Sequence, residues 1–299
     1  MYQAFFSLQK SPFRLAPDPS FLFLSNQHKE GIAHLAYGLQ ENGGFVVLTG
    51  KSGTGKTMIC HHLVKHIKNK VDLAFITDPA QNDNELLASI CTAFNIYFDV
   101  NKKTNKSLFN VLSSWMLENH HNGRKAVVLI DEAQRLSFQS LEQLRLLTNI
   151  ETNNQKPLQV ILIGRNELQK TLQQKALRQL TQRITVHYQL QPFTAQESCF
   201  YIQHRLDIAG SKSSIFKQSA MNKIAKISHG IPSIINLLCD KSLLSAFNLH
   251  KASVDLTDIN NVKLEVYDLY KESFSVKKYA LTFTYTILIA LLIFLYSIH

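Results

Sequence analysis

The stretch GFVVLTGKSGTGKTMIC, from Gly44 to Cys60, decides the fold of this chain. It begins with an apolar run, Phe45 to Leu48, whose length and composition are typical of a buried strand. The run leads into GKSGTGKT, residues 50–57, which matches G-x-x-x-x-G-K-[ST] at every specified position. The residues that follow, Met58 to Ile67, carry apolar side chains at helical spacing. A strand, a glycine-rich loop and a helix in this order predict a phosphate-binding loop.

This loop predicts a first set of nucleotide-binding residues. Glycines allow backbone conformations that are closed to other residues, so that successive amides can turn toward phosphate oxygens. The helix start adds free N–H groups and the positive end of its dipole. We expect Lys56 to reach the β- and γ-phosphates and the Thr57 hydroxyl to ligate magnesium. The predicted set is Gly50, Lys51, Ser52, Gly53, Thr54, Gly55, Lys56, Thr57 and Met58.

A second strand pattern ends in two adjacent carboxylates. The run from Ala126 to Ile130 is apolar throughout, and Asp131 and Glu132 follow it directly. In open α/β sheets, ligands bind at the carboxyl edge of such buried parallel strands. We therefore predict that Asp131 holds Mg²⁺, partly through water, and that Glu132 is the catalytic group that polarises the attacking water. The predicted ligands are ATP and Mg²⁺.

The remaining patterns predict a five-stranded parallel sheet with helices on both faces, followed by a small all-helical lid domain. Further strands are predicted at residues 73–76, 158–163 and 184–190, and further helices at 26–40, 84–98, 107–121, 137–150, 166–180, 195–209, 216–228, 231–249 and 256–273. Prolines and aromatic residues near the N-terminus predict an extended arm that covers the first strand. The predicted domains are 1–43 (arm and helix), 44–191 (nucleotide-binding), 192–275 (lid) and 279–298 (membrane span).

Three arginines are candidates for contact with the nucleotide. Arg165 follows the fourth predicted strand, where a polar group can sense the γ-phosphate, and we include it among the nucleotide-binding residues. Arg178 and Arg183 precede the fifth strand. In a ring-forming ATPase an arginine supplied to the neighbouring subunit stabilises the charge of phosphoryl transfer. Arg178 and Arg183 are therefore predicted catalytic residues of a ring or dimer, and ordinary surface arginines are the alternative.

Composition narrows the classes of function. The 299 residues allow about two domains, and the net charge of +10 points to an acidic partner such as nucleic acid, anionic lipid or nucleotide phosphates, or to a basic surface without one. The four cysteines lie far apart, without a C-x-x-C pair, which argues against a disulfide framework and a zinc site. No Ser/His/Asp or Cys/His arrangement for nucleophilic catalysis stands out in the sequence.

The C-terminal segment has the composition of a membrane span. Residues 280–298 contain no formal charge, follow Lys277 and Lys278, and are bracketed by Tyr279 and Tyr296. Basic and aromatic residues at the ends of an apolar stretch are typical of membrane interfaces. The pattern predicts a single-pass protein of a bacterial inner membrane with its ATPase domain in the cytoplasm, and a buried helix is the alternative. The N-terminus lacks the pattern of a signal peptide.

Several motifs together resemble the general secretion pathway protein A group of AAA+ ATPases, and the related biogenesis ATPase of mannose-sensitive haemagglutinin (MSHA) pili. The motifs are FFSLQKSPFRLAPDP (5–19), GKSGTGKT (50–57), LIDEAQRLS (129–137), LEQLRLLTNIET (141–152), LQVILIG (158–164), LRQLTQRI (177–184) and GIPSIINLLCDKSLL (230–244). The resemblance covers residues 1 to about 250. It implies an inner-membrane AAA+ ATPase that assists assembly of a type II secretion or type IV pilus machine, with secretion or pilus proteins as partners.

The chain departs from the family pattern at three positions. Ser233 stands where the family usually has the lid arginine, Arg165 is part of GRNEL where GQPEL is usual, and Lys51 follows the first loop glycine. Without the lid arginine, hydrolysis is expected to be weaker. Two alternatives stay open. One is a scaffold that binds ATP with little hydrolysis, which Ser233 favours. The other is a DNA-binding AAA+ protein of the transposition-regulator type, which the basic composition and the ATPase motifs favour and for which salt-sensitive DNA binding is expected.

Overall fold

The computed structural model describes residues 2–40, 43–68, 70–80, 82–100, 103–151 and 156–266. The chain divides into two compact units. The sheet unit comprises Ala16–Glu197 together with Ile231–Ser233. Of the described residues, the helical unit comprises 2–15, Ser198–Gly230 and 234–266. The units therefore interleave along the sequence, and the chain passes from one to the other more than once.

The sheet unit contains a five-stranded parallel sheet in the order β2-β3-β4-β1-β5. The strands are β1 (Gly44–Gly50), β2 (Asp72–Ile76), β3 (Ala126–Ile130), β4 (Leu158–Gly164) and β5 (Ile184–Leu190). β1, β3 and β4 are buried along their whole length, as expected for central strands covered on both faces. Because all strands are parallel, the loops after β1, β3 and β4 meet at one edge of the sheet.

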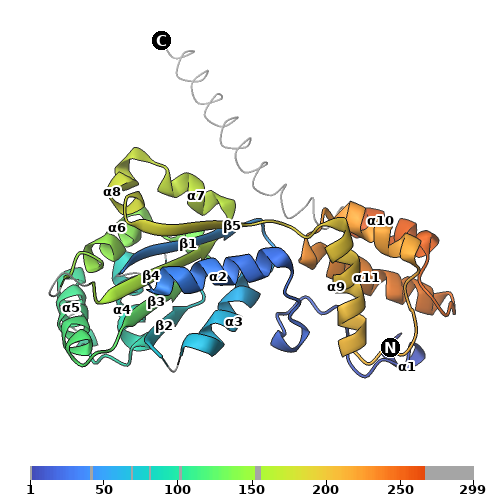
Figure 1. Cartoon of the computed structure of the whole chain (residues 1–299), viewed down its shortest axis with the longest axis horizontal. Coiled ribbons are helices and arrows are strands. Elements are labelled where there is room, and N and C mark those ends of the chain that lie inside the picture. Colours follow the sequence, from blue (N-terminus) through green and yellow to red (C-terminus); the bar gives the residue numbers. More distant parts are fainter. Residues whose placement is uncertain are drawn as a thin grey trace, which may run out of the picture. The chain divides into compact units, whose positions relative to one another are not determined.

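Helices cover both faces of this sheet (Figure 1). α2 (Asn26–Gln40) and α3 (Lys56–Ile67) pack on one face around Leu35, Leu48 and Ile59. The other face is packed by α4 (Asp83–Ala93), α5 (Asn105–His121), α6 (Phe138–Leu147), α7 (Asn166–Leu172) and α8 (Arg178–Thr181). The two 3-10 turns η3 (Ala133–Arg135) and η4 (Lys175–Leu177) lie in the connections. The predicted five-stranded parallel P-loop fold is confirmed.

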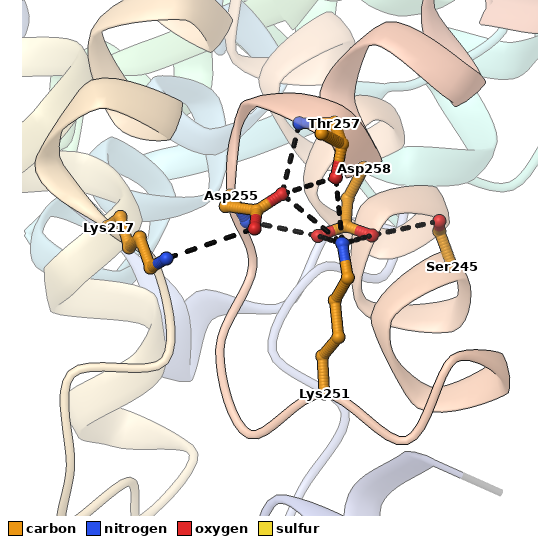
Figure 2. Close-up of polar contacts among 6 residues, drawn as sticks. All are labelled: Lys217, Ser245, Lys251, Asp255, Thr257 and Asp258. Atoms are coloured by element: carbon orange, nitrogen blue, oxygen red, sulfur yellow. Dashed lines mark hydrogen bonds and ion pairs between the residues drawn. The ribbon is translucent and has the colours of Figure 1, made fainter.

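The helical unit is built from α9 (Ala195–Ile208), most of which belongs to it, α10 (Gln218–Ser228), α11 (Pro232–Asn248) and helical residues 256–266. A cluster of polar side chains, here called the Lys251 cluster, lies where residues 256–266 begin their helix (Figure 2). It consists of Lys217, Ser245, Lys251, Asp255, Thr257 and Asp258. The Asp258 carboxylate is fully buried and accepts hydrogen bonds from Ser245, Lys251 and the backbone N–H of Asp255.

The observed elements differ from the predicted ones in two places where tertiary packing overrides the local pattern. The helix predicted at 84–98 ends at Ala93, because Asn95 adopts a left-handed conformation with φ of 57°. The helix predicted at 166–180 is broken into α7, η4 and α8. The break allows Leu172, Leu177 and Leu180, whose spacing is not that of one straight helix, to enter the same core.

The first part of the predicted N-terminal arm, residues 2–15, belongs to the helical unit and begins with a short helix, α1 (Tyr2–Phe5). The Phe13 ring lies 6.0 Å from that of Phe216, edge to face, and the Gln9 backbone N–H donates to the Ala209 carbonyl at 2.7 Å. A further 3-10 turn, η1 (Pro19–Phe21), starts at a proline, which fits the first position of such a turn.

The predicted location in a bacterial inner membrane is overturned. Across the residues that the structure describes, no helix combines the length and the apolar character needed to cross a membrane. The longest helices with described bounds, α5 and α11, have 17 residues each, whereas a span needs about 20 predominantly apolar ones. The predicted span at 279–298 lies outside the described residues.

Candidate nucleotide-binding site

The phosphate loop joins β1 to α3 and has the backbone geometry that the motif requires. Gly53 and Gly55 have φ of 78° and 98°, in the left-handed region that glycine enters without steric cost. A Cβ on Gly53 would lie 1.9 Å from the Ser233 hydroxyl oxygen, and one on Gly55 would lie 2.8 Å from His28 Nε2. Both positions therefore require glycine for space as well as for conformation.

Lys56 is the first residue of α3, and its side chain is almost completely buried. It donates to the carbonyls of Gly50 and Lys51 at 3.1 and 2.8 Å, so the loop folds around the charge. Burial lowers the pKa of Lys56, and the nearby carboxylates of Glu132 and Asp131 oppose that shift. This ammonium group and the N-terminus of α3 form a site suited to a polyphosphate.

The side chains of Thr57 and Asp131 connect the loop to β3. The Thr57 hydroxyl donates to Asp131 Oδ2 at 2.7 Å, and the Asp131 backbone N–H donates to the Ile76 carbonyl at 2.9 Å. A hydroxyl and a carboxylate are the oxygen ligands that Mg²⁺ prefers. The donor set at this edge therefore fits Mg²⁺, which Thr57 and Asp131 would hold.

Glu132 leaves the line of β3 because its own backbone is left-handed, with φ of 51°. Its Oε2 accepts from Gln134 Nε2 at 2.6 Å and lies 3.4 Å from Arg165 Nε. Arg165 is the residue that follows β4 and precedes α7. Tertiary structure thus brings together Lys56, Glu132 and Arg165, which the sequence placed in three separate motifs.

The other two predicted arginines lie elsewhere. Arg178 is exposed at the start of α8. Arg183 donates to the Thr148 carbonyl at 3.2 Å, and its own carbonyl accepts from Phe45, at the start of β1. This is the amino edge of the sheet, a full strand of about 20 Å from the phosphate loop. Arg183 is therefore not in position to reach the site of its own subunit, and the action of Arg178 and Arg183 on a neighbour stays a prediction.

Two polar residues that were not among the predicted site residues, His28 and Gln134, contact the site. His28 donates from Nε2 to the Thr54 carbonyl at 3.1 Å, and this donation requires the tautomer whose Nδ1 accepts from the Ser25 hydroxyl at 2.7 Å. Burial lowers the pKa of His28. Gln134 contacts Glu132 through its side-chain amide. Gln134 stands in the LIDEAQ motif, but nothing in the sequence places His28 beside the loop.

Two sequence comparisons agree with this geometry. A protein family described as "AAA domain" matches residues 39–172. General secretion pathway protein A of Aeromonas hydrophila is 44% identical over 266 residues. The chain is an AAA+ protein related to general secretion pathway protein A. The resemblance predicted from the motifs is confirmed. The match covers 89% of this chain and 48% of the relative, so the chain spans about half the length of that protein.

Solved structures with the same fold come from proteins of other functions. Cdc6p from Pyrobaculum aerophilum has a TM-score of 0.66 at 15% identity, over 84% of this chain and 71% of that one. The ORC1 protein of Aeropyrum pernix in complex with DNA has a TM-score of 0.63 at 16% identity, over 86% and 69%. The RuvB Holliday junction branch migration motor of Thermotoga maritima has 0.55 at 18%, over 82% and 70%. At these identities, the likeness concerns the fold alone.

Proposed function

We propose that this AAA+ protein binds Mg-ATP at the edge formed by β1, β3 and β4 and hydrolyses it to ADP and phosphate. The observation that carries the proposal is the 2.7 Å hydrogen bond between Thr57 and Asp131, because it joins the phosphate loop to the strand that delivers Glu132. Bound Mg²⁺ would neutralise charge on the β- and γ-phosphates. Lys56 would bind the same phosphates, and the α3 N-terminus would add its dipole.

In this mechanism Glu132 is the base. Its carboxylate accepts a proton from water while the water oxygen forms a bond to the γ-phosphorus. The bond between that phosphorus and the β–γ bridging oxygen breaks, and ADP leaves with the electron pair. Arg165, beside Glu132, places a cation near the developing charge of the γ-phosphate. Arg178 or Arg183 of a neighbouring subunit would add charge in a ring or dimer.

The cellular role of the proposed ATP hydrolysis is inferred from the relative, general secretion pathway protein A. General secretion pathway protein A is named for a secretion pathway, and the high identity supports a role in assembling a type II secretion or MSHA-like type IV pilus machine. Proteins of such a machine are the proposed partners. The likeness to ORC1 and RuvB concerns the fold alone, so nucleic-acid binding is no part of the proposal.

Replacing Glu132 with Gln tests the enzymatic proposal. We expect ATP binding to be retained and phosphate release to fall by about 100-fold or more, because the amide cannot accept the proton. Both are measured on the full chain, by nucleotide titration and by a phosphate-release assay. Glu118→Gln, an exposed position on α5, is the matched control and should leave turnover unchanged. Unchanged turnover in Glu132→Gln would remove Glu132 as the base.

A scaffold that binds ATP without useful hydrolysis is the second candidate, and one contact favours it. Ser233 donates from its backbone N–H to the Gly53 carbonyl at 3.3 Å, so a short neutral side chain lies against the phosphate loop where the family usually has an arginine. The same assay separates the candidates. Wild-type phosphate release that does not exceed that of a protein-free blank, with ATP binding intact, would establish the scaffold.

A further inference from the structure

The side-chain amide of Gln134 contacts two parts of the site at once. Its Nε2 donates to Glu132 Oε2 at 2.6 Å. Its Oε1 accepts from the backbone N–H of Arg165 at 2.9 Å. Gln134 belongs to the η3 turn, whereas Arg165 follows β4, so the amide bridges the carboxyl ends of two neighbouring strands.

The surrounding backbone leaves space for this bridge. A Cβ on Gly164, the last residue of β4, would lie 2.8 Å from Gln134 Oε1 and 3.2 Å from the Gln134 backbone nitrogen. Any larger residue would therefore push the amide away from Arg165. On the other side, the left-handed conformation of Glu132 turns its side chain toward the same amide. The contact depends on a glycine in one strand end and on an unusual backbone angle in the other.

A side-chain amide of this length makes both contacts, whereas an ionised carboxylate of the same length does not. Glutamine carries two N–H donors and a carbonyl acceptor on one planar group. An ionised glutamate of the same shape accepts from Arg165 but has nothing to donate to Glu132. The chemistry of residue 134 therefore matters separately from its size.

We propose that Gln134 is a positioning residue that holds the Glu132 carboxylate against the end of β4, with one oxygen turned to the attacking water. This inference rests on the proposed hydrolysis. Gln134 and Arg165 both meet Oε2, and no described residue hydrogen-bonds Oε1. Oε1 is therefore the oxygen that accepts the proton from water. A base fixed in this way needs no reorganisation when the water attacks.

Two substitutions separate positioning from mere stability. Gln134→Glu keeps the acceptor for Arg165 and removes the donor to Glu132, whereas Gln134→Ala removes both. We expect each to lower kcat by about tenfold or more, because a misplaced base loses its alignment. The KM for ATP should change by no more than about twofold, since the phosphate-binding groups are untouched. Gln173→Glu, an exposed glutamine after α7, is the matched control and should retain wild-type kinetics.

The split between kcat and KM gives a readout that a structural role would not move, because a destabilised site would weaken ATP binding as well as turnover. Gln134→Asn keeps the amide but is one methylene shorter, too short for both contacts. This variant should therefore lose kcat while its KM for ATP stays within about twofold of the wild-type value.

Each outcome has a defined meaning. Wild-type kcat in Gln134→Glu would overturn the inference, as would a KM for ATP that rises as much as kcat falls in all three variants. If Gln134→Glu does not fold, wild-type kcat in Gln134→Asn overturns it instead. Failure of the proposed function is seen separately, because the wild type would then release no more phosphate than a protein-free blank. If the wild type hydrolyses ATP and the Gln134 substitutions leave kcat unchanged, only the positioning role is excluded.

Discussion

Single residues of the phosphate loop set the shape of the proposed nucleotide site. Gly53 combines a left-handed φ with a close approach of the Ser233 side chain, so it has two independent reasons to be glycine. Gly123, after α5, has a similar φ of 73°, but no heavy atom lies within 4 Å of the position that a Cβ would occupy there. A comparison of substitutions at these two glycines therefore distinguishes the cost of backbone strain from that of a steric clash.

Gly53→Ala should weaken ATP binding far more than Gly123→Ala. Each substitution places an alanine in the left-handed region, at a cost of about 1–2 kcal/mol. Gly53→Ala adds a methyl group 1.9 Å from Ser233 Oγ, which must displace the loop or residue 233. Nucleotide titration and thermal unfolding of both variants measure the difference. Wild-type ATP affinity in Gly53→Ala would show that the nucleotide binds to a different shape of the loop.

At the scale of elements, the Lys251 cluster fixes the start of the last described helix, residues 256–266 (Figure 2). The Asp255 carboxylate accepts from the Thr257 backbone N–H at 3.0 Å, and Asp258 accepts from the Asp255 backbone N–H at 3.0 Å, a reciprocal cap. The hydrogen bond from the Thr257 side chain lowers the pKa of Asp255. The Lys251 ammonium group donates to both carboxylates, so the negative charge of the buried Asp258 is compensated.

Asp258→Ala should destabilise the helical unit by about 2–4 kcal/mol, because it removes a buried acceptor of several hydrogen bonds and leaves its donors unmatched. Lys217→Ala is the matched control. Lys217 is exposed and lies 3.8 Å from Asp255, and such surface pairs contribute about 0–1 kcal/mol. Urea unfolding followed by circular dichroism measures both. Equal losses in the two variants would mean that burial of Asp258 adds nothing to the stability of the cap.

At the scale of the whole molecule, the two compact units draw on distant parts of the sequence. Tyr2 donates a hydrogen bond to Asp240, so the first helix and α11 meet inside the helical unit. Burial raises the pKa of Tyr2, and the hydrogen bond to Asp240 adds to that shift. The neutral phenol is thus the form that the folded unit favours.

Because the folded pKa of Tyr2 lies above its ordinary value, its contribution is fully present below about pH 10 and is lost as the pH rises through the folded value. Tyr2→Phe should lower the stability of the helical unit at neutral pH and remove this alkaline dependence. The free energy of unfolding of both proteins, measured between about pH 8 and 11, checks this alkaline dependence. Tyr97→Phe, at a residue that is 89% exposed, is the control. An unchanged alkaline slope in Tyr2→Phe would assign the dependence to other groups.

The sequence by itself determined the strands, the phosphate loop and the acidic pair after β3. These features rest on local patterns: apolar runs long enough for buried strands, the glycine spacing before Lys56, and the two carboxylates directly after the run that ends at Ile130. Each is specified by residues close together in the chain, so no knowledge of distant neighbours is needed.

Only the tertiary structure decided which distant residues meet. It placed Arg165 and Gln134 against Glu132, set His28 under the phosphate loop, and moved residues 2–15 into the helical unit. It also directed Arg183 to the amino edge of the sheet. Such contacts depend on strand order and on the packing of elements far apart in sequence, which local patterns do not encode. The phosphate-loop motif was therefore readable in the sequence, and the arrangement around the proposed catalytic carboxylate was not.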